Sequence, residues 1–562
     1  MVKDEQTEPS ENVFEERAEY LSSEELHAWT TRTHRDNQIL EKLTGPGPKL
    51  LIGPRGSGKS TYLRLAYFSL LESQQALPVY VNYAKSLALE PNFHRNANAL
   101  AMFRQWVLSR IVVSLNESIG KMGAVPESLQ QLAGTCATLI EQVEARQAPE
   151  VPPTNLTPTS LLQQLEEWTE GIPPRRVVLL FDDAAHAFSS EQQREFFEIF
   201  TQLRSRYVSC KAAVYPGVTN YTPTFQLGHD AQLVEAWMRP DDPDYLVTMR
   251  EIASRRLPVS EGREQALRDS LVDYAAVASF GLPRGFLLML SEMLGLDEVS
   301  NLLPNKRLAD EAVGNFAQST RDVFDALALK LPRYKRFIEV GKQLQAQMIE
   351  SLREFNDNRP EGEQRTAVVA IQEPVSAELG RVLAFLEYAG LVRDLRSISQ
   401  GDYSYRQFWM HHAILLHENA LGLGRNPSAQ AAVAALTGRA NASRVRRSAA
   451  TLLGSNYADR CVLDLPPCER CGEPRAAAEA QYCLRCGNRL KDASVFEELL
   501  RAPIESLPLT RKKLDGILEH TEMRSVQDIL LDVEQAQLRS IRFVGPVWAS
   551  RITRYAEEFV YV

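Results

Sequence analysis

The sequence lacks several features that would have assigned it to a familiar class. No apolar run reaches the roughly 20 residues that a membrane-spanning helix needs, and residues 1–5 are polar and acidic, unlike a signal peptide. The formal net charge is −9, so any nucleic-acid-binding surface has to be local. Only 7 of the 562 residues are cysteine. We expect a cytoplasmic protein without a membrane contact, whose cysteines are free, catalytic or bound to metal rather than paired in disulfides.

The length of the chain indicates several domains. A single hydrophobic core rarely extends beyond about 250–300 residues, so 562 residues predict three to five units. The apolar content of 44% and charged content of 24% are ordinary for globular proteins, so each unit can bury its own core.

A short glycine-containing segment is the strongest chemical signal. Residues 53–60 read Gly-Pro-Arg-Gly-Ser-Gly-Lys-Ser, a complete phosphate-binding P-loop, G-x-x-x-x-G-K-[ST]. An apolar stretch at 49–52 precedes it and a helical pattern at 62–66 follows it, as the motif requires. The candidate nucleotide-binding residues are Gly53, Pro54, Arg55, Gly56, Ser57, Gly58, Lys59, Ser60 and Thr61.

These residue types suit binding of ATP with Mg²⁺. The glycines let the backbone wrap closely around phosphate oxygens, and the helix N-terminus adds positive potential. Lys59 is expected to reach the β- and γ-phosphates, and Ser60 to ligate Mg²⁺.

A second acidic site is expected at the end of another strand. Residues 177–181 are apolar and are followed by Asp182 and Asp183, which is typical of a buried parallel strand that ends at a ligand-binding edge. Asp182 is expected to hold Mg²⁺ through water. Asp183 stands where many such enzymes carry a glutamate that polarises the attacking water. Because aspartate is one methylene shorter, we expect slow hydrolysis.

Further strand and helix patterns complete an α/β core. Strands are expected at 78–82 and 211–218, with a helix at 189–206 between them. Thr219 and Asn220 follow the second strand and either place a polar group near the γ-phosphate or form a simple turn. The alternation predicts a doubly wound sheet with nucleotide at the carboxyl ends of its strands.

A further motif follows at residues 280–286, which read Phe-Gly-Leu-Pro-Arg-Gly-Phe. Together with the motifs above, it points to a particular family. From about Phe14 to Leu416 the chain resembles AAA+ ATPases of the initiator (origin-recognition-complex-like) type and the related STAND signalling ATPases. The resemblance implies that Arg284 senses the γ-phosphate from a helical lid. Arg204 and Arg206 are weaker candidates for arginine fingers, so the sequence offers no unmistakable finger.

The resemblance also implies a winged helix after the lid. A helical pattern at 374–391 and two short strand patterns fit that expectation, with Arg393, Arg396 and Arg406 as candidates for phosphate contact. A winged helix that contacts protein is the alternative. Residues 425–455 follow, with five arginines and no acidic residue, and read as either a linker or a phosphate-binding strip.

Paired C-x-x-C motifs predict a structural zinc site. Cys468, Cys471, Cys483 and Cys486 provide four sulfur ligands with the spacing of a zinc ribbon, and a glycine follows each second cysteine. Four protein ligands close the site, so Zn²⁺ is expected to be structural.

The last segment resembles another known fold. Residues 507–552 are similar to the C-terminal domain of the bacterial RNA polymerase α subunit, a helix-hairpin-helix fold. In such folds the hairpin N–H groups bind a DNA phosphate, and Arg539, Arg542, Arg551 and Arg554 add positive charge. Phe543 replaces the usual first hairpin glycine, and a protein-docking role is the alternative.

The predicted fold class is therefore multidomain α/β, with a P-loop AAA+ core, helical lid, winged helix, zinc ribbon and small all-α helix-hairpin-helix tail. The expected domains are the ATPase core at 1–255, lid at 256–325, winged helix at 326–422, basic linker at 423–460, zinc ribbon at 461–495 and helix-hairpin-helix at 496–562.

The expected function is that of an initiator-like or defence-type AAA+ ATPase, an ATP-binding and ATP-hydrolysing, Mg²⁺-dependent switch that acts on DNA. The C-terminal half is expected to bind double-stranded DNA. The alternative is a STAND-like regulator that binds ATP and senses or recruits a protein partner with little turnover. A nuclease or helicase partner and a homo-oligomer are compatible with both. A small P-loop kinase is disfavoured because a kinase needs neither the lid motif nor a winged helix.

Overall fold

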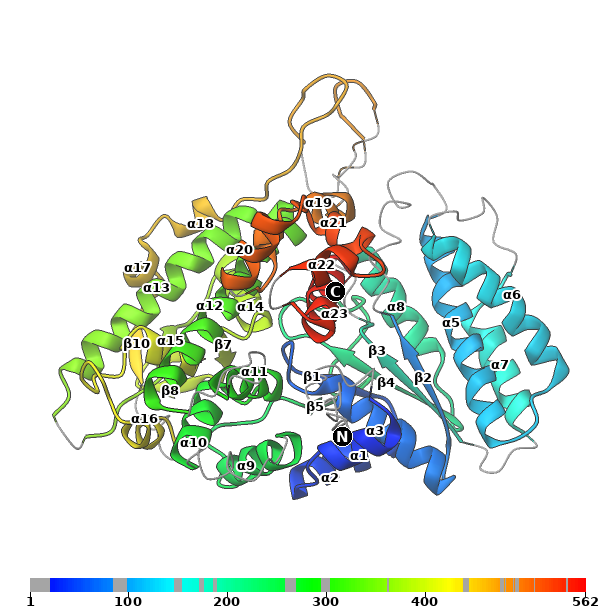
Figure 1. The fold of residues 1–562 in the computed structure, drawn as a ribbon. Helices are drawn as coiled ribbons and strands as arrows, with labels where there is room; N and C mark the ends of the chain where they lie inside the picture. The colour runs from blue at the N-terminus through cyan, green and yellow to red at the C-terminus, as the bar shows by residue number, and fades with distance from the viewer. Residues whose placement is uncertain are drawn as a thin grey trace, which may run out of the picture.

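The computed structural model places most of the chain (Figure 1). It describes residues 21–83, 99–145, 154–170, 176–184, 190–257, 269–294, 304–360, 363–437, 444–475, 480, 482–488, 490, 495–509, 511–541 and 544–561. Among these residues, no helix combines the length and apolar character needed to cross a membrane.

A parallel sheet forms the centre of the N-terminal half. Its strands are β1 (Lys49–Ile52), β2 (Leu77–Asn82), β3 (Val177–Asp182), β4 (Val208–Val214) and β5 (Gln232–Glu235). Their order is β2-β3-β4-β1-β5, and every neighbouring pair is parallel. All of β3 is buried, as expected for an inner parallel strand covered on both faces. The predicted α/β class is confirmed.

Helices cover both faces of this sheet. They are α2 (His34–Thr44), α3 (Lys59–Ser73), α5 (Ala99–Met122) and α8 (Ser190–Gln202), and α1 (Ser23–Trp29), α6 (Glu127–Glu144) and α7 (Pro158–Thr169) pack on these helices. Val178 and Leu180 of β3 pack with α2 and α3, whereas Leu179 and Phe181 join the larger core with α5 and α8. This alternation follows from the two-residue period of a strand and makes three layers.

A group of helices, named the lid after the sequence prediction, follows the sheet. Its helices are α9 (Tyr245–Arg256), α10 (Asp269–Ala278), α11 (Pro283–Met293) and α12 (Lys306–Lys330). Pro283 occupies the first turn of α11, where its missing N–H costs no helical hydrogen bond. Arg284 is therefore carried on the first turn of a lid helix.

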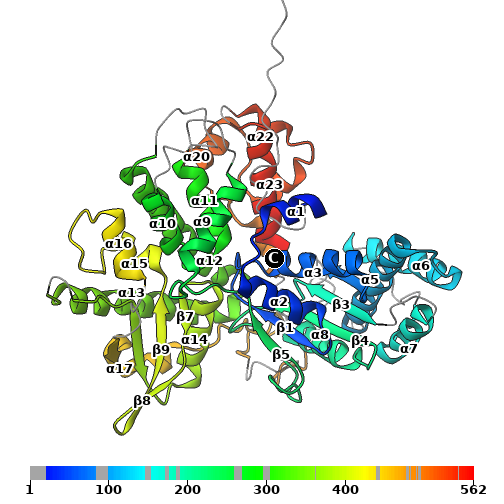
Figure 2. The same cartoon turned by 90° about the horizontal axis from the view of Figure 1, so that it is seen from below.

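A second sheet with helices follows, over the residues predicted to form the winged helix and named so below (Figure 2). Its helices are η3 (Pro332–Tyr334), α13 (Lys335–Asp357), α14 (Ala377–Tyr388) and α15 (His412–His417), and its strands are β6 (Val368–Gln372), β7 (Val392–Asp394), β8 (Ile398–Gln400), β9 (Tyr403–Met410) and β10 (Val445–Arg447). The order is β10-β6-β9-β7, and β8 pairs with β9 to form the wing hairpin.

The segment expected to be a basic linker is instead folded onto the lid helix α10 and the winged helix. It contains α16 (Ala429–Leu436), β10, α17 (Ala449–Leu453) and α18 (Tyr457–Arg460). β10 pairs in parallel with β6, and Ala432 and Leu436 are fully buried. The backbone hydrogen bonds of β10 and the apolar face of α16 hold this segment against the body, despite its arginines.

The tail has a separate small core. Its elements are α19 (Val495–Arg501), η4 (Ile504–Ser506), α20 (Arg511–His520), α21 (Val526–Leu531), α22 (Ala536–Ser540) and α23 (Pro546–Tyr561). Buried Ile517, Val526, Leu538 and Ile552 belong to this core, and Ala326 of the long lid helix α12 packs against it. The tail therefore docks on the lid.

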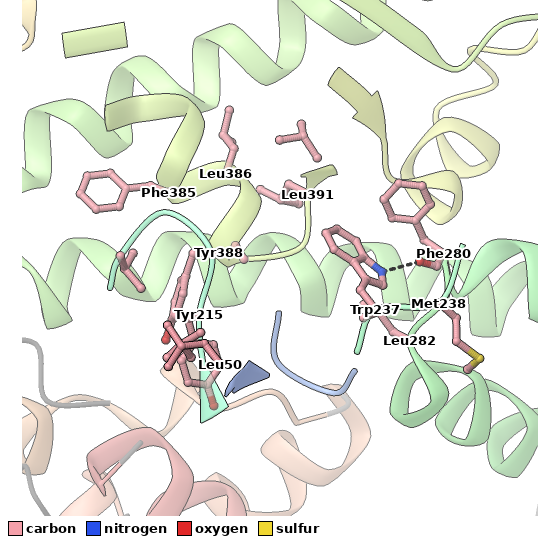
Figure 3. Packing of buried hydrophobic residues seen from close by; sticks show 14 of the residues in the cluster. Leu50, Tyr215, Trp237, Met238, Phe280, Leu282, Phe385, Leu386, Tyr388 and Leu391 are labelled. Carbon is pink, nitrogen blue, oxygen red and sulfur yellow. Dashed lines mark hydrogen bonds between the residues drawn. The ribbon is translucent and has the colours of Figure 1, made fainter. Parts of the chain in front are cut away.

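The parallel-sheet unit and the winged helix share a continuous apolar interior (Figure 3). The Trp237 indole N–H donates a 2.8 Å hydrogen bond to the Phe280 carbonyl, and the two rings meet edge to face. Tyr215, after β4, contacts Tyr388 of α14 in the same way, with ring centroids 5.6 Å apart. Movement of the winged helix would therefore disturb the strand end beside the P-loop.

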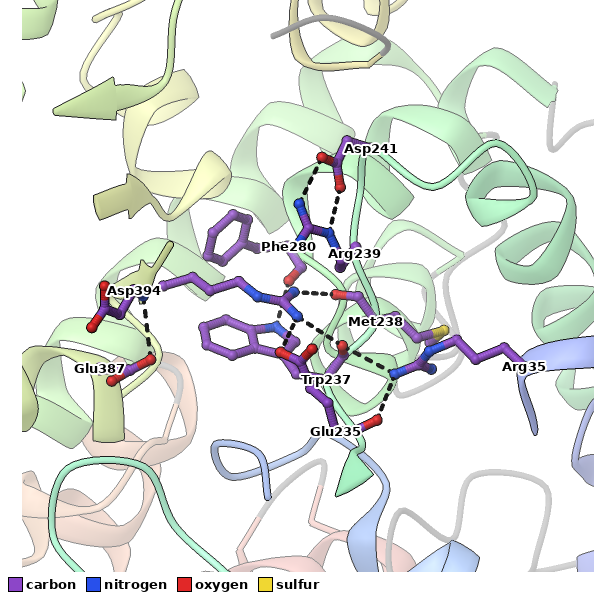
Figure 4. A network of polar contacts seen from close by, with 10 residues as sticks. Arg35, Glu235, Trp237, Met238, Arg239, Asp241, Phe280, Glu387 and Asp394 are labelled. Carbon is purple, nitrogen blue, oxygen red and sulfur yellow. Dashed lines mark hydrogen bonds and ion pairs between the residues drawn. The ribbon is translucent and has the colours of Figure 1, made fainter. Parts of the chain in front are cut away.

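A buried arginine completes the junction (Figure 4). Arg393 on β7 donates to the carbonyls of Met238 (2.8 Å) and Trp237 (3.1 Å) and pairs with Glu235. Arg35 on α2 donates to the same Trp237 carbonyl at 3.1 Å. The expectation that Arg393 contacts DNA phosphate is wrong for this arrangement, because the side chain is buried within the protein.

Candidate nucleotide-binding and cysteine sites

The P-loop connects β1 to α3 through backbone conformations that require glycine. Gly56 and Gly58 have φ of 80° and 89°, in the left-handed region that side chains disfavour. A Cβ on Gly53 would lie 2.4 Å from Oγ of Ser57. Ser60 and Thr61 follow in the first turn of α3, so the N-terminal amides of a 15-residue helix face the loop.

Lys59 is buried inside this loop. Its Nζ donates to the carbonyls of Gly53 (2.8 Å) and Pro54 (3.0 Å) and lies 3.7 Å from the Tyr215 ring centroid. Burial lowers the pKa of Lys59 to about 7, although Asp183 and Asp182 act in the opposite direction. The lysine is therefore held in place by carbonyls and an aromatic ring, in reach of the acidic pair.

The acidic pair lies at the carboxyl end of β3. Asp182 is fully buried and accepts hydrogen bonds from the Tyr80 hydroxyl (2.7 Å) and the Asp183 N–H (3.1 Å). Asp183 has φ of 53° and accepts a 3.3 Å hydrogen bond from the Tyr215 hydroxyl. The two carboxylates are thus fixed by neighbouring tyrosines, which sequence reasoning did not identify.

Thr219 and Asn220 are engaged in local contacts. The Thr219 hydroxyl donates to the Tyr215 carbonyl (2.7 Å) and accepts from the Tyr215 N–H (3.1 Å). The Asn220 side-chain amide donates to Gln193 of α8 at 2.8 Å. These contacts are those of a strand-end turn, so the γ-phosphate role of both residues stays a prediction.

Arg284 lies directly against the P-loop. Its backbone N–H approaches the Gly56 carbonyl at 3.5 Å, and a Cβ on Gly56 would lie 3.2 Å from its Cβ. Its guanidinium reaches Glu558 of α23, with Nη1 3.2 Å from Oε1. Arg55 of the P-loop contacts the other oxygen of that carboxylate, Nη2 to Oε2, at 3.2 Å. Sequence reasoning missed Glu558.

A further lysine at the end of α12 belongs to the same neighbourhood. Lys330 is buried, and burial lowers its pKa to about 7, with Arg55 lowering it further and Glu558 raising it. Its Nζ lies 5.6 Å from the ring centroid of Phe559, the residue after Glu558. Lid, P-loop and tail therefore meet at one group of charges.

The four predicted cysteines come together at the position of the orange loop in Figure 1. The sulfur atoms of Cys468, Cys471, Cys483 and Cys486 all lie within 4.8 Å of one another. The Cys468–Cys486 and Cys471–Cys483 sulfurs are 3.6 and 3.5 Å apart. Zinc–sulfur bonds of about 2.3 Å place tetrahedral sulfurs about 3.8 Å apart, so this donor set fits Zn²⁺.

The backbone around these cysteines is nearly duplicated. The Gly472 N–H donates to the Cys468 carbonyl at 2.8 Å, and the Gly487 N–H donates to the Cys483 carbonyl at 2.9 Å. Both glycines have positive φ, 70° and 66°, which explains their place after the second cysteine. Cys461 packs in the main core instead and is outside the cluster.

The candidate DNA-contacting arginines differ in availability. Arg406 pairs with Asp394, and Arg551 is buried, 4.9 Å from the Trp548 ring centroid. Arg396 and Arg539 are exposed. Arg439, Arg542 and Phe543 lie outside the described residues. The finger candidate Arg204 pairs with Asp230 at 3.1 Å, which occupies its guanidinium.

Comparison with known proteins supports the resemblance over the P-loop region. Residues 12–89, which include the whole P-loop, match the model of the ORC-CDC6-like family. A solved structure of the Aeropyrum pernix Orc1 protein in complex with DNA aligns at 18% identity, covering 70% of this chain and 94% of that chain, with a TM-score of 0.32. No curated protein matches the sequence. The predicted resemblance to initiator-type AAA+ ATPases is therefore confirmed for the matched region.

Proposed function

We propose that the protein is an ATP-binding switch that acts on double-stranded DNA, with slow Mg²⁺-dependent hydrolysis. The observation that carries the proposal is the meeting of the P-loop, the acidic pair and the lid arginine at one place. Lys59 interacts electrostatically with both Asp182 and Asp183, and Arg284 packs on Gly56. This combination of cation, acidic pair and lid contact is what a nucleotide-dependent lid requires.

In this proposal each part has a separate task. Lys59 leaves the loop carbonyls to contact the β- and γ-phosphates, and Arg284 senses the γ-phosphate from the lid. Ser60 and Asp182 would hold Mg²⁺, which would neutralise charge on the phosphates. Asp183 would orient the attacking water, and its short side chain is the reason to expect slow turnover.

Binding of ATP is tested with Lys59→Ala in isothermal titration calorimetry. Loss of the ammonium removes a charge-assisted contact, so affinity should fall at least about 30-fold, equivalent to about 2 kcal/mol. Lys42→Ala, an exposed lysine on α2, is the matched control and should bind as the wild type does. Equal affinity of Lys59→Ala and wild type would remove the basis of the proposal.

For DNA, we propose a wing strip made of Arg396, Tyr403, Tyr405, Arg444 and Arg446. Arg396 and Arg446 are exposed and make no ion pair with a described residue. Arg446 lies 5.8 Å from the Tyr405 ring centroid, and the Tyr403 side chain at the hairpin tip is 56% exposed. Exposed guanidinium groups such as those of Arg396 and Arg446 suit phosphate contact with little sequence preference.

The wing strip is tested by fluorescence anisotropy with a labelled DNA duplex at several salt concentrations. The double variant Arg396→Ala/Arg446→Ala should bind more weakly, and the slope of log affinity against log salt should shrink by about 2, because two phosphate contacts are lost. Lys42→Ala should leave affinity and slope unchanged. An unaltered slope in the double variant would exclude the wing strip as the DNA contact.

The STAND-like alternative is a regulator that binds ATP and a protein partner with little turnover. The observation in its favour is that Arg204, one of the two finger candidates, is paired with Asp230. Steady-state ATPase assays with and without duplex DNA discriminate between the proposals, since DNA stimulation favours the switch. A nuclease or helicase partner and homo-oligomerisation remain compatible with either proposal, and the cysteine cluster is proposed to hold structural Zn²⁺.

A further inference from the structure

The last helix of the chain brings an anionic group to the nucleotide site. Figure 2 shows the end of α23 near β1 and α3, the elements that flank the P-loop. Glu558 of α23 bridges two cations there, with one oxygen 3.2 Å from Arg55 of the P-loop and the other 3.2 Å from Arg284 of the lid. The carboxylate thus occupies both guanidinium groups at once.

This bridge is largely removed from solvent. The exposed fractions of the side chains are 15% for Glu558, 24% for Arg55 and 25% for Arg284. Lys330 lies in the same neighbourhood and is buried. Charges that are shielded from water interact more strongly than surface pairs, so the bridge is expected to fix α23 rather than to be an incidental surface contact.

The rest of α23 supports the same docking. Phe559 and Val560 are buried, and Ala326 of α12 packs against the tail core. The Lys330 Nζ also lies over the Phe559 ring, 5.6 Å from its centroid. The apolar contact between the tail and α12 therefore positions the Glu558 carboxylate.

We propose that Glu558 is an internal competitor of the nucleotide, and that the docked tail keeps the ATP site closed until a terminal phosphate displaces it. This inference rests on the proposed ATP binding. A bound γ-phosphate and the Glu558 carboxylate would both be negative and would both require Arg284, so the two cannot share it favourably. The lid therefore has two partners, the tail in one state and the nucleotide in the other.

The proposal predicts that the docked tail lowers the apparent affinity for ATP. If the tail is docked in a fraction of molecules, the apparent affinity for ATP is reduced in proportion to the fraction that is free. Glu558→Gln keeps the shape of the side chain but removes its charge, so it should tighten ATP binding by about fivefold or more if at least about four-fifths of molecules are docked. Glu557→Gln, one residue earlier on α23, is the matched control and should change affinity less than about twofold.

Two measurements on the full-length protein test the proposal. Isothermal titration calorimetry gives the ATP affinity of wild type, Glu558→Gln, Glu558→Ala and Glu557→Gln. Hydrogen exchange detected by mass spectrometry reports protection of α23 with and without saturating ATP. We expect tighter binding in both Glu558 variants, and faster exchange of α23 in the wild type once ATP is added.

The outcomes separate this inference from the proposed function. Equal or weaker ATP binding by both Glu558 variants, or exchange of α23 that ATP leaves unchanged, overturns the competition while ATP binding itself stands. Absence of ATP binding in wild type and in every variant overturns the proposed function and the competition with it. Thermal melts of the variants show whether the lid and core remain folded, and Glu558→Ala provides a second test if Glu558→Gln is unstable.

Discussion

The Lys59 ammonium lies 3.7 Å from the centroid of the Tyr215 ring, and the hydroxyl of the same tyrosine donates to Asp183. One aromatic residue thus contacts both the P-loop cation and the acidic pair. The Tyr215 ring also meets Tyr388 of the winged helix. A nucleotide that draws Lys59 away from this ring would therefore alter a contact that the winged helix shares.

The first prediction concerns pH. Burial lowers the pKa of Lys59 to about 7, so at pH 8.5 the free protein holds this lysine mostly neutral. Bound phosphates would favour the ammonium, so binding of ATP should take up close to one proton, and affinity should fall by up to about tenfold per pH unit between about 8 and 9. Calorimetry in buffers of different ionisation enthalpy measures the uptake. Proton uptake that persists in Lys59→Met would assign it to another group.

The second prediction concerns Asp182. Asp182→Asn keeps the size of the side chain but removes the charge proposed to hold Mg²⁺, so Mg²⁺-dependent ATP turnover should fall at least about 100-fold, with the melting temperature largely unchanged. Asp402→Asn, an exposed carboxylate of the wing turn, is the control and should turn over ATP as the wild type does. Turnover that survives in Asp182→Asn would mean that the metal-binding carboxylate lies elsewhere.

The third prediction concerns the cysteine cluster. Elemental analysis of the purified protein should find about one zinc ion per chain, because four sulfur donors fit a closed tetrahedral site. Cys471→Ser should lose most of that zinc, whereas Cys461→Ala should retain it, since Cys461 belongs to the main core. Full zinc content in Cys471→Ser would refute the ligand set.

Local motifs in this chain were predictable, but contacts between distant segments were not. The P-loop, the strand that ends at Asp182 and the paired cysteines each carry their chemistry within a few consecutive residues. The Arg284–Glu558 bridge joins residues 274 positions apart, and no periodicity or spacing indicates it. β10 is only three residues long and lies in an alanine- and arginine-rich segment. The sequence there shows no strand pattern, so the pairing of β10 with β6 could not be predicted.

Arginines illustrate the same limit and lead to the last prediction. The sequence presents Arg393 and Arg396 as equivalent candidates for phosphate contact, yet burial separates them. Arg393 satisfies the carbonyls of Trp237 and Met238 and lies 4.7 Å from the Trp237 ring centroid, whereas Arg396 is exposed on the wing. Substitution of Arg393 should therefore lower the stability of the fold, whereas substitution of Arg396 should weaken DNA binding.

Arg393→Met should therefore lower the melting temperature, because the Met238 carbonyl loses its donor and the Trp237 carbonyl keeps only Arg35, at a cost of about 1–3 kcal/mol. Its DNA affinity, measured well below the transition, should keep the salt dependence of the wild type. Arg396→Met should behave in the opposite way, with an unchanged melting temperature and a salt slope reduced by about 1. Differential scanning calorimetry and anisotropy titrations on both variants measure the two effects. A thermally unaffected Arg393→Met protein that loses DNA binding would show that β7 leaves the ATPase core and presents this arginine to DNA.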